Sequence, residues 1–212
     1  DDDDKDIKER VKANILTILS QEYGVDEDDF LSAEIEVVPA GEARDYGLDR
    51  SMIMGYGHDD RVCAYPSYRA MLEIEGAPEY TSVCLLVDKE EIGSVGASGM
   101  QSRFFENCVA EVMNLAGDYS ELAVRRALKN SKVLSSDVSA AIDPLFASTM
   151  DMKNSAYFGN GLVFNKYTGA RGKSGSNDAN AEYVAKLRKV MDDNEVTFQT
   201  AELGKVDQGG GG

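Results

Sequence analysis

Basic residues, cysteine and histidine are all scarce in this chain, and each scarcity narrows the choice of function. Lysine and arginine together number 22 against 38 aspartates and glutamates, which gives a net charge of -16 over 212 residues. Such a surface repels the phosphates of nucleic acids and the anionic head groups of membranes, and no long Lys/Arg-rich stripe interrupts it. We therefore expect neither a nucleic acid nor a membrane as a partner.

Cysteine occurs three times, as Cys63, Cys84 and Cys108. The number is odd, and the spacing matches neither a zinc knuckle nor a disulfide framework. Because each cysteine lies in an apolar pattern, we predict buried thiols in a reducing compartment. The sequence also contains no signal peptide and no apolar run of membrane-spanning length, so we expect a cytoplasmic protein.

Histidine occurs once, as His58, next to Asp59 and Asp60 in an expected loop. One imidazole beside two acids is either a metal ligand or an exposed loop residue, and the sequence leaves both readings open.

The two ends of the chain have biased compositions. The first five residues spell DDDDK, which is also a protease-cleavage tag sequence, although the acidity continues into Asp6. Both origins stay open. At the other end, the run Gly209–Gly212 follows an apparently structured segment, so we expect the chain to be interrupted there.

Hydrophobic residues make up 42% of the chain, enough for one full domain with a smaller appendage. Their periodicity predicts helices and short strands in alternation, which is typical of an α/β fold. The expected helices cover residues 7–22, 62–72, 100–115, 119–129 and 183–191, and the expected strands cover 35–38, 83–87, 132–137 and 196–198.

The most informative stretch begins with the apolar, partly β-branched run Val83–Val87, which predicts a buried parallel strand. Glu90 and Glu91 follow it, and functional groups in open α/β sheets lie beyond the carboxyl ends of the strands. Neighbouring side chains of an extended chain point to opposite sides, so we predict different tasks for the two glutamates. One binds a metal and the other transfers a proton. The alternative is a solvated acidic loop.

Two further acids lie at comparable places. Asp60 stands at a loop-to-helix junction, and Asp137 follows the predicted strand 132–137. Each alone is more simply a helix cap or a turn residue. Three loop-end carboxylates from successive units, however, together indicate one site. The glycine-rich, basic segment 144–178 either binds a substrate carboxylate or backbone beside that site or is an ordinary surface loop.

Three motifs, taken together, resemble the aspartyl aminopeptidase family. They are Gly57–Arg61 (GHDDR), Asp88–Ser94 (DKEEIGS) and Ser136–Ala140 (SDVSA). Members of the family are dinuclear zinc metallopeptidases related to vacuolar aminopeptidase I and, more distantly, to the tetrahedral aminopeptidases. The resemblance covers residues 47–212 well, and residues 7–42 resemble the tail of the family's inserted dimerisation domain.

The resemblance implies a fold and an assembly. The fold is an α/β three-layer sandwich with a mixed, mostly parallel sheet, as in zinc exopeptidases. Residues 1–45 would end the dimerisation domain, and residues 46–212 would form an incomplete metallopeptidase catalytic domain. The family's dimers assemble into a dodecamer, so a homo-oligomer is expected.

The resemblance also implies roles for four residues. Asp60 matches the aspartate that bridges both metals, Glu91 a terminal ligand of one metal and Asp137 a terminal ligand of the other. Glu90 matches the general base. The implied cofactor is two Zn²⁺ per subunit, with Mn²⁺ or Co²⁺ as possible substitutes, and the implied activity is removal of N-terminal amino acids from peptides.

This sequence departs from the family pattern in two ways. The family takes two histidine ligands from segments before and after the matched region, and His58 matches neither. We therefore expect an internal fragment that binds zinc weakly and is inactive as it stands. Relatives selective for acidic substrates carry a lysine where this chain has Phe164 or Asn165, so that selectivity is not carried over.

The family implies one backbone feature. Its members hold the peptide bond after the bridging aspartate in the cis form, which predicts a cis bond between Asp60 and Arg61.

Two other functions remain open at this stage. One is a non-catalytic acidic α/β interaction module, and the other is a related dinuclear deacylase or carboxypeptidase. Zinc stoichiometry separates the first from an aminopeptidase, and a panel of amino-acyl and N-acyl substrates separates the second.

Overall fold

The computed structural model describes residues 8–166 and 179–205. The two biased ends of the sequence lie outside the described residues, as do Arg171 and Lys173 of the basic segment. The chain forms two compact units, Asp1–Tyr56 and Gly57–Gly212. The predicted domain boundary after residue 45 falls inside the first unit.

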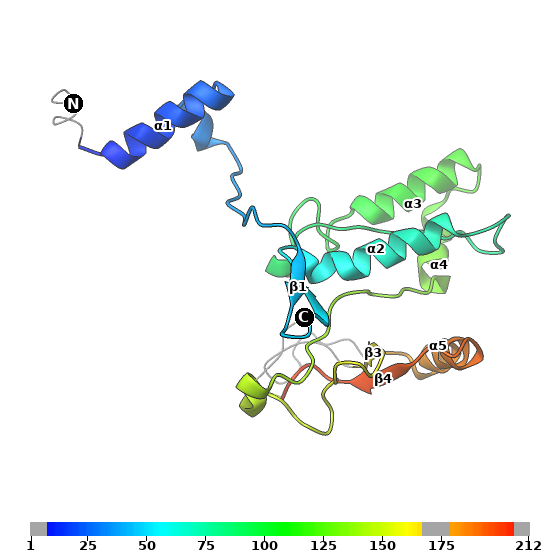
Figure 1. Ribbon diagram of the computed structural model, residues 1–212. Helices are drawn as coiled ribbons and strands as arrows, with labels where there is room; N and C mark the ends of the chain where they lie inside the picture. Colours follow the sequence, from blue (N-terminus) through cyan, green and yellow to red (C-terminus); the bar gives the residue numbers. More distant parts are fainter. Residues whose placement is uncertain (1–7, 167–178, 206–212) are drawn as a thin grey trace. The chain divides into compact units, whose positions relative to one another are not determined.

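The first unit contains helix α1 (Arg10–Tyr23), the short 3-10 helix η2 (Asp28–Leu31) and a hairpin (Figure 1). Helix α1 ends at Gly24, which adopts the left-handed φ of 70° and donates its N–H to the Ser20 carbonyl at 2.9 Å. This ending is the common glycine C-cap. The predicted helix 7–22 is therefore confirmed over its described part.

The hairpin pairs β1 (Arg44–Tyr46) with β2 (Met52–Met54) in antiparallel register. Its turn contains the Asp49 carboxylate, which accepts hydrogen bonds from the Ser51 amide at 3.2 Å and hydroxyl at 2.9 Å. These bonds lower the pKa of Asp49. The strand predicted at 35–38 is wrong, because that segment pairs with no strand in the described part of the chain and Val37 is 96% exposed.

Where it is described, the second unit contains four α-helices, and the four helices predicted for it are confirmed with shifted ends. They are α2 (His58–Leu72), α3 (Phe104–Leu115), α4 (Glu121–Asn130) and α5 (Ala181–Asp193) (Figure 1). Local capping fixes two of the starts. Ser120 accepts from the Ala123 amide at 3.1 Å, and Asn180 accepts from the Tyr183 amide at 2.9 Å. Two short 3-10 helices, η3 (Glu90–Ile92) and η4 (Pro144–Thr149), lie in the connections.

Strands β3 (Leu162–Asn165) and β4 (Phe198–Ala201) form a parallel pair. The strand predicted near the second of these, at 196–198, is thus confirmed with a shift. The rings of Phe164 and Phe198 pack edge to face with centroids 5.5 Å apart. The Gln199 side-chain amide also joins the preceding loop, because it accepts from the Tyr157 amide and donates to the Tyr157 carbonyl, each at 3.0 Å.

Few side chains are fully buried in the described part of the chain. The buried apolar residues are Val124, Ala156, Ala201 and Leu203. Among the described residues the strands form two separate two-stranded sheets, one antiparallel and one parallel. The α/β class is therefore confirmed, whereas a single mixed sheet is not formed here.

Two predicted strands of this unit are wrong. Segment 83–87 forms no strand with any described residue; its neighbour Asp88 makes a single bridge, to Gly99, and Val83 is 58% exposed. Segment 132–137 is likewise unpaired among the described residues, with Val133 68% exposed. A strand depends on hydrogen bonds to a neighbouring strand, and β-propensity alone does not supply that neighbour.

The prediction of three buried thiols is also wrong. Cys63 and Cys84 are half-buried and Cys108 is exposed. Cys108 lies on α3, whose expected inward face is open in this structure, since Phe104 is 64% and Leu115 is 86% exposed. The apolar periodicity predicted helix α3 correctly, but it did not predict whether another element packs on the apolar face of that helix. None of the helices in the described ranges is long and apolar enough to cross a lipid bilayer.

The cap of α4 provides a test of this local structure. We expect Ser120→Ala to lower the free energy of unfolding by about 1 kcal/mol, because the Ala123 amide loses its acceptor. Urea titration of the chain at constant m-value measures the change. Ser120→Asp retains an acceptor and should keep most of the stability. An equal loss in both variants would show that the cap is not the cause.

Candidate active site

Glu90 and Glu91 begin the 3-10 helix η3, at the tip of a tight loop. Lys89 before them and Gly93 after them both adopt left-handed φ values, 66° and 87°. Both glutamates are exposed. The premise that they lie in extended chain is therefore wrong. Their side chains still point in different directions, because a 3-10 helix turns by about a third of a circle per residue.

Asp59 and Asp60 lie at the start of α2, where both have non-helical backbone angles. Asp60 is half-buried, whereas Asp59 and His58 are exposed. The peptide bond between Asp59 and Asp60 is cis, and it is the one cis bond in the described part of the chain. The prediction of a cis bond between Asp60 and Arg61 is therefore wrong by one residue.

Asp137 is half-buried in the unpaired segment before η4. One of its carboxylate oxygens accepts from the Val138 amide at 2.7 Å. Two residues later, the Ser139 hydroxyl donates to the Asn165 side-chain oxygen at 3.5 Å. This contact connects the segment that carries Asp137 to β3, where Phe164 and Asn165 are both half-buried.

The structure brings the acids of these separate segments close enough for their charges to interact. Partial desolvation by neighbouring atoms raises the pKa of the exposed Glu90 most, and the charges of Asp137, Glu91, Asp59 and Asp60 raise it further. Partial desolvation likewise raises the pKa of the exposed Asp59 most, followed by the charges of Asp137 and Asp60. The four predicted site residues therefore lie close enough to interact, although they come from three parts of the sequence.

Two residues near the acids were missed by the sequence analysis. Asp59 was given no role, although it stands in the same motif as Asp60. Cys63, one turn further along α2, was placed among buried structural thiols. Burial raises the pKa of its thiol most, a hydrogen bond from the Ser136 side chain lowers it, and the charge of Asp137 raises it. Only the helical spacing of Asp60 and Cys63 could have indicated this proximity.

The donor chemistry of the site fits a divalent cation. Carboxylates that raise one another's pKa are held together against their mutual repulsion, and a cation relieves that repulsion. Zinc accepts carboxylate oxygen, as do harder cations. Among the described residues, however, no three His, Cys, Asp or Glu side chains converge closely enough to surround an ion. The acids interact through their charges without forming a coordination sphere.

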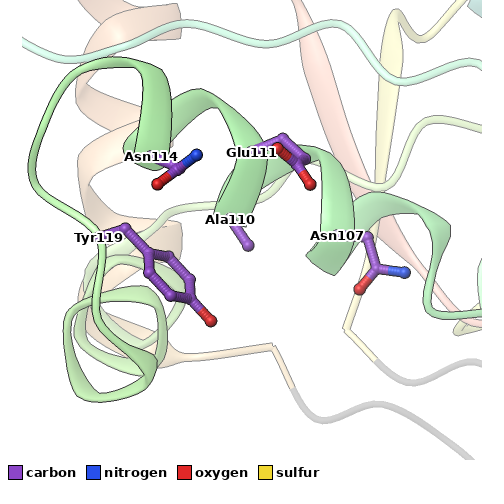
Figure 2. A pocket seen from close by; sticks show the side chains of 5 residues that line it. All are labelled: Asn107, Ala110, Glu111, Asn114 and Tyr119. Carbon is purple, nitrogen blue, oxygen red and sulfur yellow. The ribbon is translucent and has the colours of Figure 1, made fainter.

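A separate pocket lies along α3 and contains none of the predicted site residues. Its volume is about 560 Å³. Figure 2 shows its lining side chains on successive turns of α3 and on the following loop. These residues are Asn107, Ala110, Glu111, Asn114 and Tyr119.

Comparisons with known proteins show the family to which the chain belongs. Residues 1–212 match the family model described as aminopeptidase I zinc metalloprotease (M18), so the chain belongs to this family. The resemblance drawn from the three motifs is confirmed at that level.

Individual relatives show how much of a protein this chain represents. The chain is 63% identical over 209 residues to the probable M18 family aminopeptidase 1 of Clostridium acetobutylicum. This match covers 99% of the present chain but 45% of that protein. The crystal structure of aminopeptidase I from the same organism matches with a TM-score of 0.85 at 60% identity, over 99% of this chain and 45% of that one. The M18 aminopeptidase structure from Thermotoga maritima gives 0.88 at 47% identity, over 98% and 46%. The chain therefore spans a little under half the length of these relatives.

The cysteines offer a direct test of the burial near the site. At pH 8 we expect Cys63 of the 212-residue chain to react with iodoacetamide several-fold more slowly than Cys108. The raised pKa of Cys63 lowers its thiolate fraction, whereas Cys108 is exposed. Mass spectrometry of tryptic peptides resolves the two sites. Raising the pH should narrow the difference, and equal rates at pH 8 would contradict the described burial.

Proposed function

We propose that the protein carrying this chain is a metal-dependent aminopeptidase, which removes N-terminal amino acids from peptides. The observation that carries the proposal is the match of residues 1–212 to the M18 family. The charge interactions among acids from α2, η3 and the segment around Asp137 support it, because a hydrolytic metal centre draws on several carboxylates from nearby segments.

Each acid has a proposed task. Glu91 and Asp137 are terminal metal ligands, and a carboxylate of the Asp59–Asp60 pair bridges two ions. Two Zn²⁺ per subunit would supply Lewis acidity and a water molecule of lowered pKa, and Mn²⁺ or Co²⁺ are possible substitutes. Histidine ligands are expected from outside this chain, because its single histidine is exposed and matches neither position.

Glu90 is the proposed general base. It takes a proton from the attacking water and returns it to the leaving amine. Its raised pKa supports this role. A base whose pKa lies closer to 7 both accepts and releases a proton more readily near pH 7. Glu90 and Glu91 are adjacent but point in different directions on the 3-10 turn, which suits one base and one ligand.

The bridging position has two candidates. The motif alignment places it at Asp60. Asp59 is the alternative, because it lies near enough to Asp137 for their charges to repel, as expected of two carboxylates around one pair of ions. Both residues also raise the pKa of Glu90, so either could lie beside the reacting water.

The finer statements about fold and assembly are part of this proposal. In the intact protein the second unit would belong to a three-layer α/β sandwich with a mixed, mostly parallel sheet. Residues 1–45 would end a dimerisation domain, and the dimers would assemble into a dodecamer. The TM-scores of 0.85 and 0.88 to aminopeptidase structures support the fold. A cytoplasmic location agrees with the sequence features described above.

The preference of some relatives for an acidic N-terminal residue is not carried over to this chain. Phe164 or Asn165 stands where acid-selective relatives carry a lysine, and neither supplies a positive charge. A panel of amino-acyl and N-acyl substrates tests the activity itself. Hydrolysis of N-acyl substrates alone would replace the aminopeptidase with a deacylase or carboxypeptidase, and the absence of hydrolysis and of metal would indicate an interaction module.

The base can be separated from the ligands by one substitution. In the intact protein, Glu90→Gln should keep its zinc but lose kcat on the order of 10²-fold or more, because it removes the proton acceptor only. Glu91→Gln is the matched control and should lose zinc. Elemental analysis and steady-state kinetics measure both effects. Retained activity with lost zinc in Glu90→Gln would reverse the two assignments.

The bridging carboxylate is identified by zinc stoichiometry. Asp60→Ala should release both ions from the intact protein, because both depend on the shared ligand. Asp59→Ala, one residue away, should then retain zinc. The reverse pattern would assign the bridge to Asp59. Loss of a single ion in each variant would refute a bridge from this pair.

A further inference from the structure

The loop that carries Glu90 and Glu91, residues 88–101, folds back on itself. Two backbone hydrogen bonds close it: the Ser94 amide donates to the Lys89 carbonyl at 2.7 Å, and the Gln101 amide donates to the Ser94 carbonyl at 3.1 Å. Asp88 and Gly99 form a parallel bridge at its base. The ends of the loop are thus held together although no complete strand leads into it.

The backbone of this loop is strained on both sides of the glutamates. Lys89 and Ser94 have side chains, yet their φ values are 66° and 60°. Residues with a side chain rarely adopt this conformation, and it persists only where the surroundings fix it. A Cβ on the buried Gly99 would overlap the Ser94 carbonyl, so the backbone segments at Gly99 and Ser94 are in close contact. Without support, the loop would relax and turn the glutamates.

Two side chains supply that support. The Ser98 hydroxyl donates to the Asp88 carboxylate at 3.1 Å and closes the base of the loop. The Gln101 side-chain amide donates to the Gly93 carbonyl at 2.7 Å. Gly93 ends the 3-10 turn, and its own amide donates to the Glu90 carbonyl at 2.8 Å. A continuous set of hydrogen bonds therefore runs from Gln101 through Gly93 to Glu90.

We propose that Gln101 is a positioning residue, whose side-chain amide fixes the 3-10 turn so that Glu90 and Glu91 keep their separate directions. The part of this inference that concerns catalysis rests on the proposed function, in which Glu90 is the base and Glu91 a ligand. Gln101 itself does not touch the reacting atoms. It is exposed, so substitutions at this position leave the core intact.

Asn194 provides a matched control. It follows α5, and its side-chain amide donates to the Val190 carbonyl at 2.8 Å, much as Gln101 bonds Gly93. Gln101→Glu and Asn194→Asp each remove one such donor and add one negative charge. Gln101→Met removes the donor without adding charge, and so separates the hydrogen bond from electrostatic repulsion by the neighbouring acids.

The first measurement is hydrogen–deuterium exchange in the intact protein without added metal. We expect Gln101→Glu and Gln101→Met to speed exchange at least several-fold in peptides that cover residues 90–101, since the Gly93, Ser94 and Gln101 amides lose protection. Asn194→Asp should leave that loop unchanged. Unchanged exchange in both Gln101 variants, or faster exchange in Gln101→Glu alone, would overturn the proposal.

The second measurement concerns the site. Both Gln101 variants should lower kcat on the order of 10-fold with little change in KM, because a small displacement of a catalytic group is costly. They should also alter the visible spectrum of the Co²⁺-loaded protein, whereas Asn194→Asp should change neither. A wild-type protein without peptidase activity would overturn the proposed function, and exchange would still decide the role of Gln101. An active wild type with unaffected Gln101 variants would overturn the positioning role alone.

Discussion

Repulsion among carboxylates is the constraint on which the rest of the second unit depends. Asp59, Asp60, Glu90, Glu91 and Asp137 come from three segments, and their charges raise the pKa of at least two members. Acids left to themselves would separate into solvent, because each then gains hydration and loses a like-charged neighbour. The backbone instead keeps them together, by the non-helical start of α2 and the left-handed residues around η3. These unfavourable backbone conformations cost free energy. In return they hold together a cluster of negative charge that could attract a cation.

The helices could be predicted from the sequence because their determinants are local. Apolar spacing, the Ser120 and Asn180 caps and the Gly24 ending all act within a few residues, and each is present in the structure. The strands at 35–38, 83–87 and 132–137 could not be predicted in the same way. Their composition suits a strand, but pairing requires a partner distant in sequence, and the described residues do not provide one.

The candidate site was predictable in part for the same reason. Glu90, Glu91 and Asp137 were found because acids that follow apolar runs are visible in the sequence, even though those runs are not strands here. The proximity of Asp59 and Cys63 to acids from the other segments is a property of the folded chain, and the sequence indicates only the helical spacing between Cys63 and Asp60. The cis bond was placed one residue too late because the motif contains two aspartates in succession, and the choice between them had no local signal.

The exposed apolar side chains of this chain have a consequence for its behaviour in solution. Leu115, Val37 and Val133 are each more than two-thirds exposed, and the segments that carry Val37 and Val133 are unpaired among the described residues. Such surfaces favour self-association. The net charge of -16 opposes it, because like-charged molecules repel at long range. Dissolved salt shortens that range to about 8 Å at physiological ionic strength, while the apolar attraction remains. Higher salt therefore favours self-association of this chain, and low ionic strength favours the dispersed state.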